Sequence, residues 1–131
     1  MKTFGKIFAA VTLGLCSHIT FAAPSYLITH NHTDVESNAY IDGTLASPYP
    51  TKAHADNSVN WLAVRMACIG RTTNNKCKAL IKMATNTSNP VILGWLEMDL
   101  STGDITPKQV QGNGYTLTVN DNPGEVTLSQ D

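Results

Sequence analysis

Short apolar runs, broken by Gly, Pro, Asn and Asp, follow the first 22 residues of the chain. No long stretch has the spacing of a helix face, and such runs between turn-forming residues are typical of β-strands. The pattern predicts an all-β domain. The expected strands are Tyr26–Thr33, Asn38–Asp42, Val59–Ile69, Cys77–Thr85, Val91–Leu100, Ile105–Val110, Tyr115–Asn120 and Glu125–Ser129.

The first 22 residues have the pattern of a secretory signal peptide. Two lysines precede an apolar run at residues 7–15, and small residues stand at −3 and −1 of a cleavage site after Ala22. A membrane anchor needs about 20 uninterrupted apolar residues, and residues 16–18 interrupt this run. Lipidation at Cys16 is the other alternative, although leucine precedes it where a small residue is needed. We expect one secreted or periplasmic domain at residues 23–131, without a transmembrane anchor.

The two longest central runs predict a hairpin. Val59–Ile69 and Cys77–Thr85 are separated by turn-forming residues, and strand side chains alternate between two faces. On that alternation Cys68 and Cys77 both lie on the more apolar faces. An even pair of cysteines in an oxidising compartment most simply forms one disulfide, so we expect a Cys68–Cys77 bridge. Two buried free thiols are the alternative.

Two further turn signals complete the predicted fold. Residues 101–104 separate two expected strands, and Asn122-Pro123-Gly124-Glu125 has the residue order of a type II turn. Short strands at this spacing predict a single-domain antiparallel β-sandwich, with immunoglobulin-like layers, or a small barrel of seven or eight strands.

Charge narrows the range of partners. Without the two lysines of the signal segment, the domain carries seven basic and ten acidic residues, a net charge of −3. Nucleic-acid-binding proteins are normally strongly basic, so we expect no nucleic-acid partner. The sequence leaves the oligomeric state open.

Two histidines in the first expected strand suggest a metal site. On a strand, His30 and His32 share a face with Asp34, and their backbones are about 6–7 Å apart. With His54 they would form a zinc or copper set, completed by Asp34 or Asp56. Two exposed polar segments are the alternative. The sequence predicts no other cofactor.

Basic residues gather around the expected hairpin. The functional interpretation is a face that meets an anionic glycan or an acidic protein, and the alternative is a solvated surface. We expect Trp95 in the core and leave the place of Trp61 open. The candidate face comprises Trp61, Arg65, Arg71, Lys76, Lys78 and Lys82.

Catalytic motifs such as G-x-S-x-G, H-E-x-x-H and the P-loop are missing. The segments NWLAVRMACIG, CKALIKMATNT, PVILGWLEMDLSTGDITP and NGYTLTVNDNPGE resemble small exported proteins of unknown activity from Legionella-like bacteria. Some of those are type II secretion substrates. The resemblance covers most of the domain, implies release beyond the periplasm, and supplies no catalytic residues.

These observations predict a secreted, non-enzymatic binding module or virulence-associated factor that meets a protein or glycan surface. A periplasmic or secreted metal-binding protein using His30, His32 and His54 is the alternative. A small hydrolase is the third hypothesis.

Overall fold

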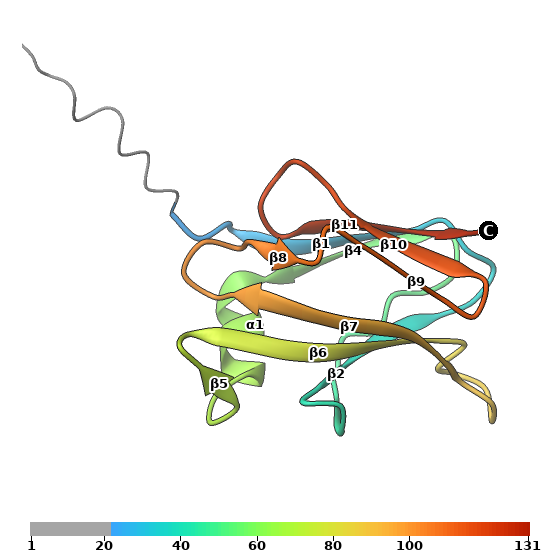
Figure 1. Cartoon of the computed structure of the whole chain (residues 1–131), viewed down its shortest axis with the longest axis horizontal. Helices are drawn as coiled ribbons and strands as arrows, with labels where there is room; N and C mark the ends of the chain where they lie inside the picture. The colour runs from blue at the N-terminus through green and yellow to red at the C-terminus, as the bar shows by residue number, and fades with distance from the viewer. Residues whose placement is uncertain (1–21) are drawn as a thin grey trace, which may run out of the picture.

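Residues 22–131 form two β-sheets packed face to face, with one short helix at one end (Figure 1). The computed structural model describes residues 22–131, so the predicted signal segment lies outside the described residues except for Ala22. One sheet has the strand order β4–β1–β11–β10–β9; the other has β3–β2–β6–β7–β8, with β5 paired to β6. The strands are β1 (Tyr26–Asn31), β2 (Ser37–Ile41), β3 (Leu45–Ala46), β4 (Ala55–Asn60), β5 (Thr72–Thr73), β6 (Lys76–Met83), β7 (Val91–Asp99), β8 (Ile105–Thr106), β9 (Gln109–Gly112), β10 (Tyr115–Val119) and β11 (Glu125–Gln130).

The predicted sandwich is confirmed, with changes at the ends of individual strands. The expected strand Ile105–Val110 is divided into β8 and β9 near Pro107, whose nitrogen has no hydrogen to donate to a neighbouring strand. β4 was not predicted, because ADNSVN contains few apolar residues. Nevertheless β4 pairs along its whole length with β1, and its residues alternate between half-buried and exposed.

The expected strand Val59–Ile69 is wrong: its larger part is the helix α1 (Trp61–Ala67). Asn60 caps the helix, since its side chain accepts a hydrogen bond from the backbone N–H of Leu62 at 2.9 Å. Leu, Ala, Arg and Met are strong helix formers. Trp61, Val64 and Cys68 are buried at the i, i+3, i+7 spacing of a helix face, and that spacing was the overlooked signal.

The predicted disulfide is present in a different setting. Cys68 caps the C-terminus of α1 and bonds to Cys77 in β6, with Cα atoms 6.1 Å apart. Both residues are buried. The bridge therefore fastens the helix to the six-stranded sheet instead of crossing a hairpin between two strands.

The core lies between the two sheets. Met83, Leu93, Leu117 and Leu128 are among its most buried side chains, and they come from strands of both layers. A cavity of about 120 Å³ remains between the layers, lined mainly by apolar side chains. No helix within residues 22–131 is long and apolar enough to cross a membrane.

Candidate functional site

An aromatic row crosses the outer face of the six-stranded sheet. Leu80 in β6 lies opposite Tyr40 in β2 on one side and opposite Trp95 in β7 on the other. The flanking residues Ala79 and Ile81 point the other way, into the core. Tyr40 and Trp95 thus shield Leu80, which is 7% exposed although it lies on the outer face.

Trp95 is the most prominent side chain of this row. We expected it in the core, but it is 49% exposed. The reason is a register shift between β6 and β7, after which Leu93 and Leu96 both fill the interior while Trp95 faces outward. The indole packs against Gly43: a Cβ atom placed there would lie 2.7 Å from Cη2 of Trp95. One side of the ring is therefore braced by backbone while about half of the side chain stays open to solvent.

Charged and polar side chains surround the exposed indole. A shallow groove of about 430 Å³ lies beside Trp95 and is lined by Lys78, Glu97, Thr106, Pro107 and Leu96. In the strand register, Lys78 lies opposite Glu97, and Glu97 lies opposite Thr106. The groove thus combines one aromatic surface with hydrogen-bond donors and acceptors.

Lys78 and Lys82 give this face a positive charge. The ammonium of Lys82 lies 4.4 Å from the centre of the Tyr40 ring, a cation–π contact that holds the side chain over the aromatic row. None of the ion pairs within residues 22–131 involves Lys78 or Lys82. Neither ammonium group is therefore held by a carboxylate of the described residues, although Lys78 lies opposite Glu97. We call Tyr40, Leu80, Trp95, Lys78 and Lys82 the aromatic face.

The predicted basic face is divided by the structure. Lys78 and Lys82 belong to the aromatic face, whereas Arg65 lies on α1 and Arg71 follows it. Lys76 begins β6, opposite Asp99. Trp61 is no surface anchor: it is 4% exposed, and its indole N–H donates to the carbonyl of Leu100 at 3.0 Å. The helix turns Trp61 inward, which a strand assignment could not show.

His30 binds two carboxylates on the outer face of the other sheet. Its Nδ1 lies 2.9 Å from Oδ1 of Asp56, and its Nε2 lies 2.7 Å from Oε2 of Glu125. The hydrogen bonds to Asp56 and then to Glu125 raise the pKa of His30 above 6.5. The hydrogen bond from His30 lowers the pKa of Glu125 in turn. Protonated His30 is therefore a link between β4, β1 and β11.

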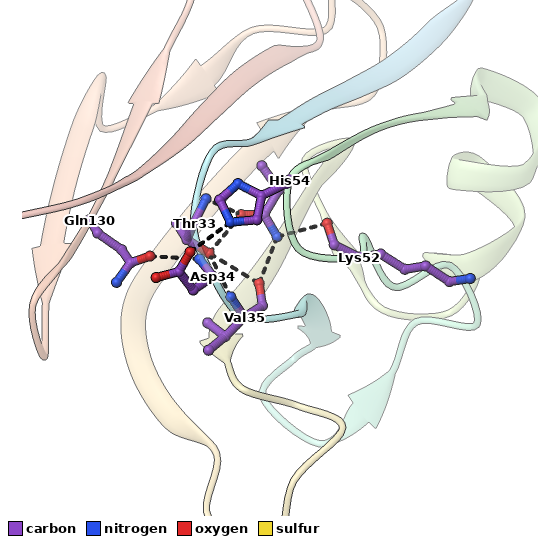
Figure 2. A network of polar contacts seen from close by, with 7 residues as sticks. Thr33, Asp34, Val35, Lys52, His54 and Gln130 are labelled. Carbon is purple, nitrogen blue, oxygen red and sulfur yellow. Dashed lines mark hydrogen bonds and ion pairs between the residues drawn. The ribbon is translucent and has the colours of Figure 1, made fainter.

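His54 belongs to a separate network at the end of β1 (Figure 2). Its Nε2 lies 2.6 Å from Oδ1 of Asp34, and the backbone N–H of Asp34 donates to Gln130. Beneath them Asn31 and Thr33 are fully buried, and the Asn31 amide donates to the carbonyls of neighbouring loops. This network fixes the turn after β1 and the segment before β4.

The predicted metal set is not assembled. His30 and His32 have ring centres 6.5 Å apart, but His30 turns to Asp56 and Glu125 while His54 binds Asp34. Within residues 22–131 no group of three or more His, Cys, Asp or Glu side chains is placed to hold a metal ion. Asp34 and Asp56 were predicted as ligands and instead hydrogen-bond to His54 and His30, whereas Glu125, the second partner of His30, was not predicted.

Sequence reasoning missed the aromatic face as a unit. Lys78 and Lys82 were candidates, but Tyr40 and Trp95 could join them only through the pairing of β2, β6 and β7. A usable signal was present, because Lys78, Leu80 and Lys82 alternate with the apolar residues that face the core.

Comparison with known proteins identifies the family. A sequence-family profile described as "T2SS substrate NttC" matches residues 1–131. The chain belongs to the NttC family. A solved structure, the crystal structure of the Legionella pneumophila type II secretion system substrate NttC, is 55% identical, with a TM-score of 0.81. The match covers 83% of this chain and all of that one. No curated protein matches the chain.

Membership of the NttC family confirms the predicted resemblance. The family is described as a type II secretion substrate family, and secreted or periplasmic passage of this chain is consistent with that description. An oxidising compartment on that route fits the Cys68–Cys77 bridge.

Proposed function

We propose that this NttC-family protein is an exported, non-enzymatic binding module whose aromatic face binds a glycan carrying carboxylate or sulfate groups. The supporting observation is Trp95: a half-exposed indole, braced by Gly43, in a groove lined by polar side chains and flanked by lysines. The glycan would belong to a host or bacterial surface reached after secretion, in keeping with a virulence-associated role.

The chemistry of the face suits a sugar ring. The C–H faces of a pyranose are apolar and pack against the negative face of an aromatic ring. Hydroxyl groups at the ring edge need donors and acceptors, which Lys78, Glu97 and Thr106 supply around the groove. Because the indole is already held in place, little side-chain entropy is lost on binding.

The lysines favour an acidic sugar over a neutral one. Lys78 and Lys82 lie on the same side of β6, flanking Leu80 in the aromatic row, and neither forms an ion pair within the described residues. Sulfate and carboxylate groups accept charge-assisted hydrogen bonds from ammonium groups. The affinity should therefore fall as salt concentration rises.

Calorimetric titration with a heparin-derived tetrasaccharide, and with neutral chitotetraose for comparison, tests the proposal. Trp95→Ala should weaken heparin binding at least tenfold, as expected for an aromatic anchor. Tyr26→Ala is the matched control, since Tyr26 is 47% exposed but lies on β1 of the other sheet. Lys78→Ser should weaken binding and reduce its salt dependence. Equal affinities for Trp95→Ala and the unmodified protein would contradict the proposal.

A further inference from the structure

The helix α1 is apolar on two opposite faces. Its inward face buries Trp61 and Val64 against the core. Its outward face carries Leu62 and Met66, which are 64% and 61% exposed, and the same stripe continues to Ile69, which is 72% exposed. Leu62 and Met66 have the i, i+4 spacing of one helix face, and Ile69 lies just beyond the C-cap Cys68, where its backbone N–H donates to the carbonyl of Met66 at 3.2 Å. We call Leu62, Met66 and Ile69 the apolar ridge.

The ridge is unusual for a helix at the surface of a soluble domain. A surface helix normally turns polar residues to solvent, and a helix that is apolar all round is normally covered on all sides. Exposures above 60% at three neighbouring apolar side chains mean that no described segment of the chain covers them. Such side chains protrude, so they fit a surface that can deform around them.

Positive charge accompanies the ridge. Arg65 lies beside Leu62 on the helix, three residues further along the chain, and exposed Arg71 follows two residues after Ile69. No acidic residue occurs between Asp56 and Glu97 in the sequence. Neither arginine takes part in the ion pairs seen within residues 22–131. The ridge thus combines exposed apolar side chains with two uncompensated guanidinium groups.

The end of the molecule that carries the ridge is accessible and rigid. α1 and β5 lie together at one end of the sandwich, away from the C-terminus (Figure 1). The Cys68–Cys77 disulfide fastens the end of α1 to β6, and the backbone N–H of Arg71 donates to the carbonyl of Cys68 at 2.9 Å. The backbone of Ile69 and Arg71 is therefore held beside the end of the helix.

We propose that the apolar ridge binds the protein to an anionic phospholipid bilayer. The three apolar side chains enter the boundary between headgroups and acyl chains, and Arg65 and Arg71 contact lipid phosphates. Charge complementarity selects this occupant, since a second copy of the chain would bring the same arginines together. Binding of this kind is peripheral and reversible, because only three side chains are inserted.

Vesicle co-sedimentation of the exported, oxidised protein tests the proposal. The probes are vesicles of phosphatidylcholine alone and of an equimolar mixture of phosphatidylcholine and phosphatidylglycerol. The protein should sediment with the mixed vesicles at low salt and much less with phosphatidylcholine alone. Each arginine should contribute about fivefold to the partition constant, so Arg65→Ser and Arg71→Ser should each reduce it by about that factor.

Matched substitutions separate the ridge from general surface properties. Leu62→Ser combined with Met66→Ser should lower the partition constant at least tenfold. Ile92→Ser is the apolar control, since Ile92 is 49% exposed on β7. Lys52→Ser is the charge control. Lys52 lies before the start of β4 and α1 begins after the end of β4, so the length of that strand separates Lys52 from the apolar ridge. Neither control should change the partition constant.

Three results would overturn the proposal. The first is no binding to the mixed vesicles. The second is binding that the ridge substitutions leave unchanged or that is equal on neutral vesicles. The third is a dimer in solution that Leu62→Ser with Met66→Ser converts to a monomer, because the ridge would then be covered by a second copy of the chain.

Discussion

Loss of the Cys68–Cys77 disulfide is expected to lower the free energy of unfolding by about 2.6 kcal/mol. The two cysteines are nine residues apart, and the chain-entropy model gives about 2.6 kcal/mol for a cross-link closing a loop of that size. For a domain of this length the entropy of unfolding converts that loss to a fall in Tm of about 11 °C. Reduction of the unmodified protein isolates this effect, because both sulfur atoms stay in place.

The double variant Cys68→Ala with Cys77→Ala adds a packing loss to the loss of the cross-link. Both side chains are buried and line the cavity between the sheets, so removing the sulfur atoms enlarges it. We expect a further loss of roughly 1–2 kcal/mol. Urea denaturation of the oxidised, reduced and double-variant proteins measures the two contributions separately. The reasoning is refuted if reduction leaves the urea midpoint unchanged, or if reductant still destabilises the double variant.

Three other substitutions test separate parts of the structure. Hydrogen bonds to two carboxylates raise the pKa of His30, so its contribution to stability is complete below pH 6.5 and is lost as pH rises through the raised value. Urea titrations should show that the stability difference between the protein and His30→Asn shrinks as pH rises above about 6.5; a constant difference would argue against the ion pairs. Gly43→Ala should lower the free energy of unfolding by about 1–3 kcal/mol and shift tryptophan fluorescence, because φ is +82° at Gly43 and the new methyl group would meet the Trp95 indole. Gly114→Ala is the control: φ is +87° there, but the new methyl group would lie in open space, so the fluorescence should stay unchanged. Met83→Ala should lower the free energy of unfolding by about 2–5 kcal/mol, measured by thermal or urea denaturation, because Met83 is fully buried. Met66→Ala should lower it by less than about 0.5 kcal/mol, because Met66 is exposed. Similar losses for the two variants would refute the assignment of the core.

The sandwich could be predicted because most strands combine an apolar face with flanking turn residues. β6 is the clearest example: its alternation placed Cys77 inward and Lys78 outward before any partner strand was known. β4 gave almost no signal, since it is held by backbone pairing with β1 more than by its own apolar side chains. Strand pairing of that kind depends on neighbours distant in the sequence.

The helix and the candidate site show two further limits of the sequence. Trp61–Ala67 is apolar at nearly every position, so strand periodicity is present beside the helical spacing of Trp61, Val64 and Cys68, and the Asn60 cap was the second signal for a helix. The expected histidine set does not assemble, because His54 pairs with Asp34 and His30 pairs with Asp56 and with Glu125 from β11, whose parallel pairing with β1 the sequence did not show. The aromatic face depends on register in the same way, because Trp95 points outward only after the shift between β6 and β7.

The most direct measurement of glycan binding follows the two tryptophan indole N–H signals in ¹H–¹⁵N spectra during titration with the heparin-derived tetrasaccharide. Trp61 is an internal reference, since its buried indole donates to the carbonyl of Leu100. The account predicts a progressive, salt-sensitive shift of the Trp95 signal while the Trp61 signal stays in place. Two unmoved signals, or equal movement of both, would contradict binding at the aromatic face.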